Sequence, residues 1–184
     1  MRLRSLIAVV LFAWLALAGA VAGAQSQDGA YSNYRLGVGD VITIQVLGED
    51  DLKREKIRLS DAATISYPIL GEIRLMGKTV AELEGLIRDG LKGRYLLNPQ
   101  VTVTINQYRN FFINGQVVTS GGFQYEPGLT VRKAVSLAGG FKERASREKI
   151  FIIREDDPSQ TPRKVDLNAS VNPGDIITVE ESFF

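Results

Sequence analysis

The stretch VGDVITIQV, residues 38–46, has a near-copy in PGDIITVEE, residues 173–181. In each copy a Gly-Asp pair stands directly before a run that is rich in β-branched residues. Gly-Asp is a turn signal and β-branched residues favour strands, so each copy predicts a turn that leads into a strand. Many β proteins contain such a phrase, so the repeat by itself indicates structure and specifies no chemistry.

The sequence predicts two small β-rich units, each with one helix, with a boundary near residues 107–110. This is an α+β fold class. The first copy of the phrase opens the first unit, and the second copy closes the second unit. In the first unit, strand-like patterns predict a strand at 41–47, two or three short strands within 57–77, and a strand at 100–107. The charged stretch 49–56 is expected to form a loop.

The period of the apolar residues changes to that of a helix over residues 78–96. The side chains expected on its buried face are Val80, Leu83, Ile87 and Leu91. Thr79 followed three residues later by Glu82 predicts a capping box, in which each side chain bonds a free backbone N–H of the other residue. We therefore expect an amphipathic helix that begins after Thr79.

The second unit shows the same mixture of short strands, turns and one helix. Residues 131–140 predict a short helix that ends at Gly139-Gly140, and 119–123 reads as a glycine turn. The expected strands are 111–118, 149–155, 163–168 and 173–181.

The first 24 residues have the pattern of a secretory signal peptide. Arg2 and Arg4 precede an apolar run, and small residues follow it at 22–24. We expect cleavage between Ala24 and Gln25, which leaves residues 25–33 as a flexible lead-in. The alternative is a membrane anchor, but the apolar run is shorter than the roughly 20 residues that span a bilayer.

Composition excludes several classes of function. The chain has 22 Lys and Arg against 21 Asp and Glu, so it lacks the basic surface that nucleic-acid binding requires. It contains no Cys and no His. Disulfides, a lipid-anchor cysteine, Ser-His-Asp catalysis and His or Cys metal sites are therefore excluded. We expect no catalytic residue, no cofactor and no metal site.

Two motifs invite a chemical interpretation and fail on spacing or context. In GEIRLMGKT, Gly71 lies one position too far from Gly77 for a phosphate-binding loop. Acidic residues cluster at 49–51 and at Asp156-Asp157. A glycosidase needs two carboxyl groups held on rigid elements across a substrate, whereas these clusters lie in predicted turns. A glycan hydrolase that uses Asp156 or Asp157 therefore stays the least favoured alternative.

Taken together, the phrases resemble the polysaccharide export (outer-membrane polysaccharide exporter) family of bacterial envelopes. YRLGVGDVITIQV, ISYPILGEIRLMGKTVAELEGLI and NPQVTVTI resemble its export domain. INGQVVTSGGFQYEPGLTVRKAVSLAGG and PGDIITV resemble a soluble-ligand-binding β-grasp (SLBB) domain. The resemblance covers about residues 31–181 and implies an export domain at 34–107 and a β-grasp domain at 108–184.

The residues that carry this resemblance have structural roles in turns and helix ends. Glycine supplies backbone turns that other residues resist, and aspartate can bond to the backbone beyond it. These residues are Gly39, Asp40, Pro68, Gly71, Gly77, Thr79, Gly115, Gly121, Gly128, Gly139, Gly140, Pro173, Gly174 and Asp175.

The resemblance implies a non-catalytic part of a machine that exports capsular polysaccharide or exopolysaccharide. Such proteins form rings of identical subunits in the periplasm and outer membrane. They work with an inner-membrane polysaccharide co-polymerase, often paired with a tyrosine kinase. A conduit of this kind offers polar surfaces with many weak contacts, because a tightly held chain would not move on.

The sequence departs from the family pattern in three respects. It has no lipid-anchor cysteine, no amphipathic segment after the β-grasp unit, and Ser120 where the pattern has proline. We therefore expect a short periplasmic member that acts with a separate outer-membrane pore protein. The alternative is a periplasmic module that binds saccharide and has no transport role.

Overall fold

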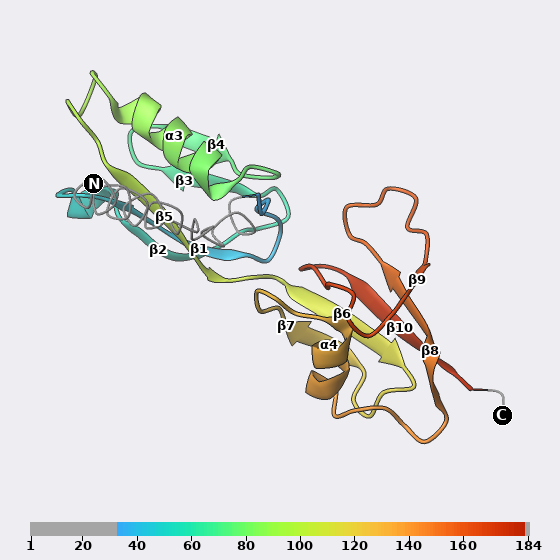
Figure 1. The fold of residues 1–184 in the computed structure, drawn as a ribbon. Helices are drawn as coiled ribbons and strands as arrows, with labels where there is room; N and C mark the ends of the chain where they lie inside the picture. Colours follow the sequence, from blue (N-terminus) through green and yellow to red (C-terminus); the bar gives the residue numbers. More distant parts are fainter. Residues whose placement is uncertain (1–32, 183–184) are drawn as a thin grey trace, which may run out of the picture. The chain divides into compact units, whose positions relative to one another are not determined.

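The structure is a computed structural model, and it describes residues 33–182. The predicted signal peptide, its cleavage site at Ala24 and Gln25, and nearly all of the predicted lead-in lie outside these residues. Within these residues two α-helices accompany strands in several sheets, which confirms the α+β fold class (Figure 1). None of the helices in the described part is long and apolar enough to cross a membrane.

The first half of the fold is built around a three-stranded antiparallel sheet in the order β2-β1-β5. A hairpin of β3 and β4 and the helix α3 complete it, and α3 buries Leu83, Ile87 and Leu91 in the core that they share. The elements are β1 (Val41–Val46), η1 (Asp50–Leu52), β2 (Arg54–Arg58), β3 (Thr64–Tyr67), β4 (Gly71–Arg74), α3 (Val80–Leu91) and β5 (Val101–Gln107).

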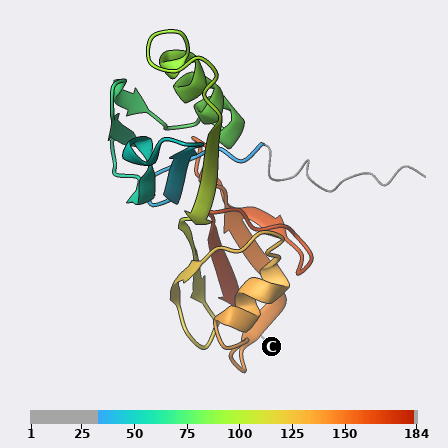
Figure 2. The same cartoon turned by 90° about the vertical axis from the view of Figure 1, so that its left-hand side faces the viewer.

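The second half is a five-stranded sheet in the order β7-β6-β10-β8-β9. The strand β10 lies at its centre, parallel to β6 and antiparallel to β8. The helix α4 packs on one face of this sheet (Figure 2) and buries Val131, Ala134 and Val135 there. The elements are β6 (Asn110–Gly115), β7 (Gly121–Gln124), α4 (Val131–Leu137), β8 (Ala145–Ile153), β9 (Arg163–Val165) and β10 (Ile176–Glu181).

Three local predictions were wrong. The charged stretch 49–56 is not all loop, because Arg54 begins β2, which pairs with β1. The glycine turn at 119–123 gives way to β7 from Gly121, which pairs with β6. The first helix ends at Leu91, short of the expected 96. In the first two cases, pairing with the preceding strand of the chain outweighs local preference.

Candidate functional site

The two Gly-Asp turns place the two buried polar side chains of the described residues. Asp40 and Asp175 are both buried, and no other polar or charged residue within 33–182 is. A buried carboxylate is costly unless hydrogen bonds and opposite charge compensate it. The surroundings of these two residues therefore determine whether they act in chemistry or in structure.

Asp40 receives hydrogen bonds on both carboxylate oxygens. Its Oδ2 accepts from the Gly37 N–H at 2.8 Å, and its Oδ1 accepts from the Arg109 N–H at 2.8 Å. The Tyr34 hydroxyl lies 2.8 and 2.7 Å from the two oxygens, and the Arg109 guanidinium forms an ion pair with Oδ2 at 3.2 Å. The carboxylate is thus fully engaged, with no oxygen left for a substrate.

Asp175 repeats the arrangement with different partners. Its Oδ2 accepts from the Asn172 N–H at 2.6 Å, and its Oδ1 accepts from the Glu155 N–H at 3.4 Å. Arg154 pairs with Oδ2 at 2.6 Å. Each aspartate therefore binds the N–H three residues before it, an N–H of another segment, and an arginine.

This geometry corrects the expected role of the aspartates. We expected each to bond to the backbone beyond it, but each side chain holds the backbone before it, at Gly37 or Asn172. Gly39 and Gly174 have φ of 92° and 86°, a conformation that glycine adopts without strain. The repeated phrase thus builds the same buried-aspartate turn twice, and each turn feeds a sheet strand.

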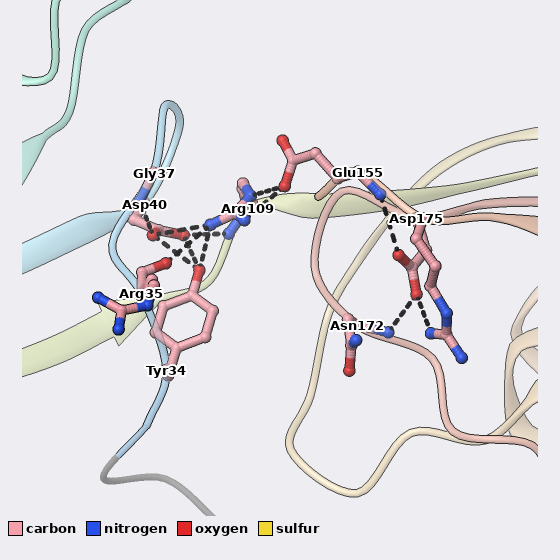
Figure 3. Close-up of polar contacts among 9 residues, drawn as sticks. Tyr34, Arg35, Gly37, Asp40, Arg109, Glu155, Asn172 and Asp175 are labelled. Atoms are coloured by element: carbon pink, nitrogen blue, oxygen red, sulfur yellow. Dashed lines mark hydrogen bonds and ion pairs between the residues drawn. The ribbon is translucent and has the colours of Figure 1, made fainter. Parts of the chain in front are cut away.

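Arg109 connects the two turns (Figure 3). It lies in the short connection between β5 and β6, and its guanidinium contacts Asp40 and donates to the Tyr34 oxygen at 2.5 Å. Its Nε donates to Glu155 Oε2 at 2.7 Å, and the backbone N–H of Glu155 caps Asp175. The guanidinium also lies 5.5 Å from the centre of the Tyr34 ring. One charged side chain therefore links both turns.

The pKa values of this network follow from burial and pairing. Burial and the neighbouring Asp40 raise the pKa of the Tyr34 phenol far above its ordinary value. Burial alone would lower the pKa of Arg109, but the hydrogen bond to Glu155 and the nearby Tyr34 and Asp40 outweigh it, so the pKa is raised. Both raised pKa values keep the Tyr34 phenol and the Arg109 guanidinium protonated at neutral pH.

The burial of Asp175 predicts how the free energy of unfolding depends on pH. Burial raises the pKa of its carboxyl above the ordinary value, and the hydrogen bonds from Asn172 and Arg154 offset only part of that rise. A raised folded-state pKa means that the native protein binds the proton more tightly than the unfolded chain does. We therefore expect Asp175 to contribute stability below the unfolded pKa of about 3.9, and this contribution is lost as pH rises through the folded pKa.

The measurement is urea unfolding of the native protein and of Asp175→Asn at several pH values from about 4 to 7. As pH falls across the window, the native protein should gain free energy of unfolding relative to the variant, which has no carboxyl to titrate. The quantity compared is the free energy of unfolding of the native protein minus that of Asp175→Asn. If this value stays constant with pH, or falls as pH falls, the raised pKa of Asp175 is contradicted.

Comparison with known proteins now identifies the chain. A family model described as "Polysaccharide biosynthesis/export protein" matches residues 28–106, and an SLBB domain model matches residues 110–163. The chain belongs to the polysaccharide export family. Its two matched segments cover the export-domain phrases and most of the β-grasp phrases of the sequence.

Two curated relatives carry corresponding names. The "Exopolysaccharide production protein ExoF" of Rhizobium meliloti (strain 1021) is 32% identical over 148 residues, which are 73% of this chain and 34% of the relative. The "EPS I polysaccharide export outer membrane protein EpsA" of Ralstonia nicotianae (strain ATCC BAA-1114 / GMI1000) is 26% identical over 181 residues, 80% of this chain and 47% of the relative. The chain thus spans about a third to a half of these relatives.

In this member of the family the other predicted turn residues lie at the ends of elements or in the turns between them. Thr79 caps α3 by accepting from the Glu82 N–H at 3.2 Å, and Glu82 accepts from the Thr79 N–H at 2.9 Å. Pro68 follows β3, Pro173 lies in the second aspartate turn, and Gly121 begins β7. Among these predicted turn residues, the further glycines with positive φ are Gly71, Gly77, Gly115, Gly121, Gly128, Gly139 and Gly140.

The two acidic clusters lie at a short helix and in a turn. Residues 49–51 lie at the short helix η1 and its cap. Asp157 accepts from the Ser159 N–H in the same turn and from Arg163 at the start of β9. Within residues 33–182, no group of three or more acidic side chains is placed to hold a metal ion.

Sequence reasoning missed Arg109, Tyr34 and Glu155. The available signal was weak: a lone arginine in the connection between two predicted strands, next to a tyrosine. Its partners are distant in sequence, so no local spacing could have indicated them.

Proposed function

We propose that this protein is a non-catalytic component of the machine that exports exopolysaccharide or capsular polysaccharide. The observation that carries the proposal is the succession of an export domain and an SLBB domain in one chain. The printed names of both relatives, one for exopolysaccharide production and one for polysaccharide export, support the same process.

The geometry supports a role without a chemical step. Both buried carboxylates are occupied by backbone N–H groups and arginines, so neither is available as a general acid, base or nucleophile. A general base must lie within hydrogen-bond reach of a substrate proton. A hollow of about 570 Å³ is lined by residues of β8, of β9 and of the segment after β9, among them the exposed charged side chains Arg147, Glu148 and Lys164.

The finer parts of the proposal concern place, partners and assembly. The protein acts in the periplasm in association with the outer membrane, as a ring-forming conduit or adaptor of identical subunits. Its partners are an inner-membrane polysaccharide co-polymerase with its tyrosine kinase and a separate outer-membrane pore protein. The export domain occupies residues 34–107 and the β-grasp domain 108–184, after removal of a signal peptide.

Deletion and complementation test this function directly. We expect a strain that lacks the gene to lose surface polysaccharide, and a plasmid copy of the whole chain, but not the empty plasmid, to restore it. Polysaccharide is measured separately on the cell surface and inside the cell, because a conduit defect leaves it inside. Unchanged surface polysaccharide in the deletion strain would contradict the export role.

The native mass of the protein tests the assembly. A ring or other oligomer is expected by light scattering of the protein purified from the envelope. A stable monomer that retains saccharide would favour the binding module over the conduit.

A further inference from the structure

The five-stranded sheet has one face that α4 does not cover. Along β6, Phe111 and Ile113 point to the α4 side and are buried, whereas Phe112 and Asn114 point to the other side and are exposed. Side chains alternate between the faces of a strand. We call the side opposite α4 the open face; its central residues are Phe112, Asn114, Ile176, Thr178, Phe151 and Ile153.

The strand register brings the apolar members of the open face into one row. Phe112 on β6 lies opposite Ile176 on β10, and Ile176 lies opposite Ile153 on β8. Phe112 is 48% exposed, and both isoleucines are half-buried. On the other side Phe112 faces Gly122 of β7, where a Cβ would lie 2.9 Å from the ring atom Cε1. The glycine thus leaves room for the ring beside an apolar strip.

The neighbouring row is polar with one aromatic ring. Asn114 lies opposite Thr178, Thr178 opposite Phe151, and Phe151 opposite Lys164 on β9. Cross-strand neighbours of this kind have Cβ atoms about 5 Å apart. Residues two positions apart on a strand are about 6.6 Å apart, so these hydrogen-bonding groups lie one step along the strands from the apolar row.

The area of the apolar row separates the possible occupants. A fully buried aromatic side chain removes about 150 to 250 Å² from solvent, so the exposed part of Phe112 is about 100 Å². The half-buried members of the open face bring the apolar patch to a few hundred Å² at most. A stable protein–protein interface buries about 800 Å² on each partner. A second copy of this chain would need much more surface than this row offers.

We propose that the open face is a weak binding surface for a hexopyranose chain. A pyranose has an apolar C–H face, which packs on the Phe112 ring and the adjacent isoleucine, and hydroxyl groups at its rim, which meet Asn114, Thr178 and Lys164. Pockets and surfaces that bind small ligands combine apolar contact area with a few placed polar groups in this way. The inference rests on the proposed function and names the surface by which the β-grasp domain contacts the glycan.

The test measures binding of cellohexaose, maltohexaose and laminarihexaose to the isotopically labelled protein by NMR. Each saccharide is added up to about 10 mM, which is enough to follow binding with a Kd of about 1 mM. We expect saturable, millimolar binding of at least one hexasaccharide, with shifts at alternate residues of β6, β10 and β8. Phe112→Ala should weaken binding roughly fivefold or more because it removes the exposed ring. Phe112→Tyr keeps the ring and should retain binding.

Leu137→Ala is the matched control, because Leu137 is 51% exposed on α4, away from the open face. Its affinity should equal that of the native protein. Absence of binding to all three hexasaccharides, shifts confined to other elements, or unchanged affinity in Phe112→Ala would overturn the proposal. Self-association that Phe112→Ala abolishes would assign the face to a second copy instead. Export by the complemented strain is scored separately, so failure of this surface is distinct from failure of the proposed function.

Discussion

Gly115→Ala is expected to reduce the free energy of unfolding by about 3 to 5 kcal/mol, the range of severe backbone defects. Gly115 ends β6 with φ of 86°, opposite Val179 of β10. A Cβ at this position would overlap the Val179 carbonyl oxygen and lie 3.1 and 3.2 Å from its C and N atoms. All three are backbone atoms, so no side-chain rotation relieves the overlap. The central β6–β10 pair must separate locally to accept the methyl group.

Gly128→Ala is the matched control for this variant. Gly128 has φ of 78°, but a Cβ there would have no heavy atom within 4 Å. Its cost should be that of the backbone conformation alone, about 1 kcal/mol. Urea unfolding monitored by far-UV circular dichroism measures both variants. Equal losses would show that the close approach to Val179 contributes nothing.

Asp40→Ala should produce the second large loss, about 3 to 5 kcal/mol, as expected when one partner of a buried charge network is removed. The substitution leaves the N–H groups of Gly37 and Arg109 without their acceptor. It also removes the negative charge that faces the Arg109 guanidinium beside the Tyr34 hydroxyl. Buried donors without acceptors cost more than the hydrogen bonds they made.

The control is Asp51→Ala, an exposed aspartate in η1, which should change the free energy of unfolding by less than about 0.5 kcal/mol. The loss of free energy of unfolding in Asp40→Asn should lie between the losses in Asp40→Ala and Asp51→Ala, because the amide keeps an acceptor oxygen but loses the charge. A loss in Asp40→Ala no greater than in Asp51→Ala would mean that water replaces the carboxylate at the first turn.

Features with a local cause were predictable from the sequence. The helix α3 follows from the spacing of its apolar residues and from the Thr79–Glu82 pair, whose partners are three positions apart. The strands β1 and β10 follow from their β-branched runs. By contrast, β2 is charged and largely exposed, so only its pairing with β1 makes it a strand.

The candidate site was predictable only in part, because its contacts join distant segments. The Gly-Asp phrases indicated turns, but surface turns and buried turns share the same residues. The buried charge of Asp40 is compensated by Arg109, and that of Asp175 by Arg154 and the Glu155 backbone N–H. The position of these partners depends on how β5, β6 and β8 come together, which no short spacing encodes.

The central position of β10 has a consequence for how the protein is made. The strands β6 and β8 are synthesised first and have no partner between them until residues 176–181 emerge, because β10 separates them in the sheet. Pairing between segments so distant in sequence closes slowly. The five-stranded sheet therefore stays incomplete until residues 176–181 have been synthesised, however early β6 and β8 leave the ribosome.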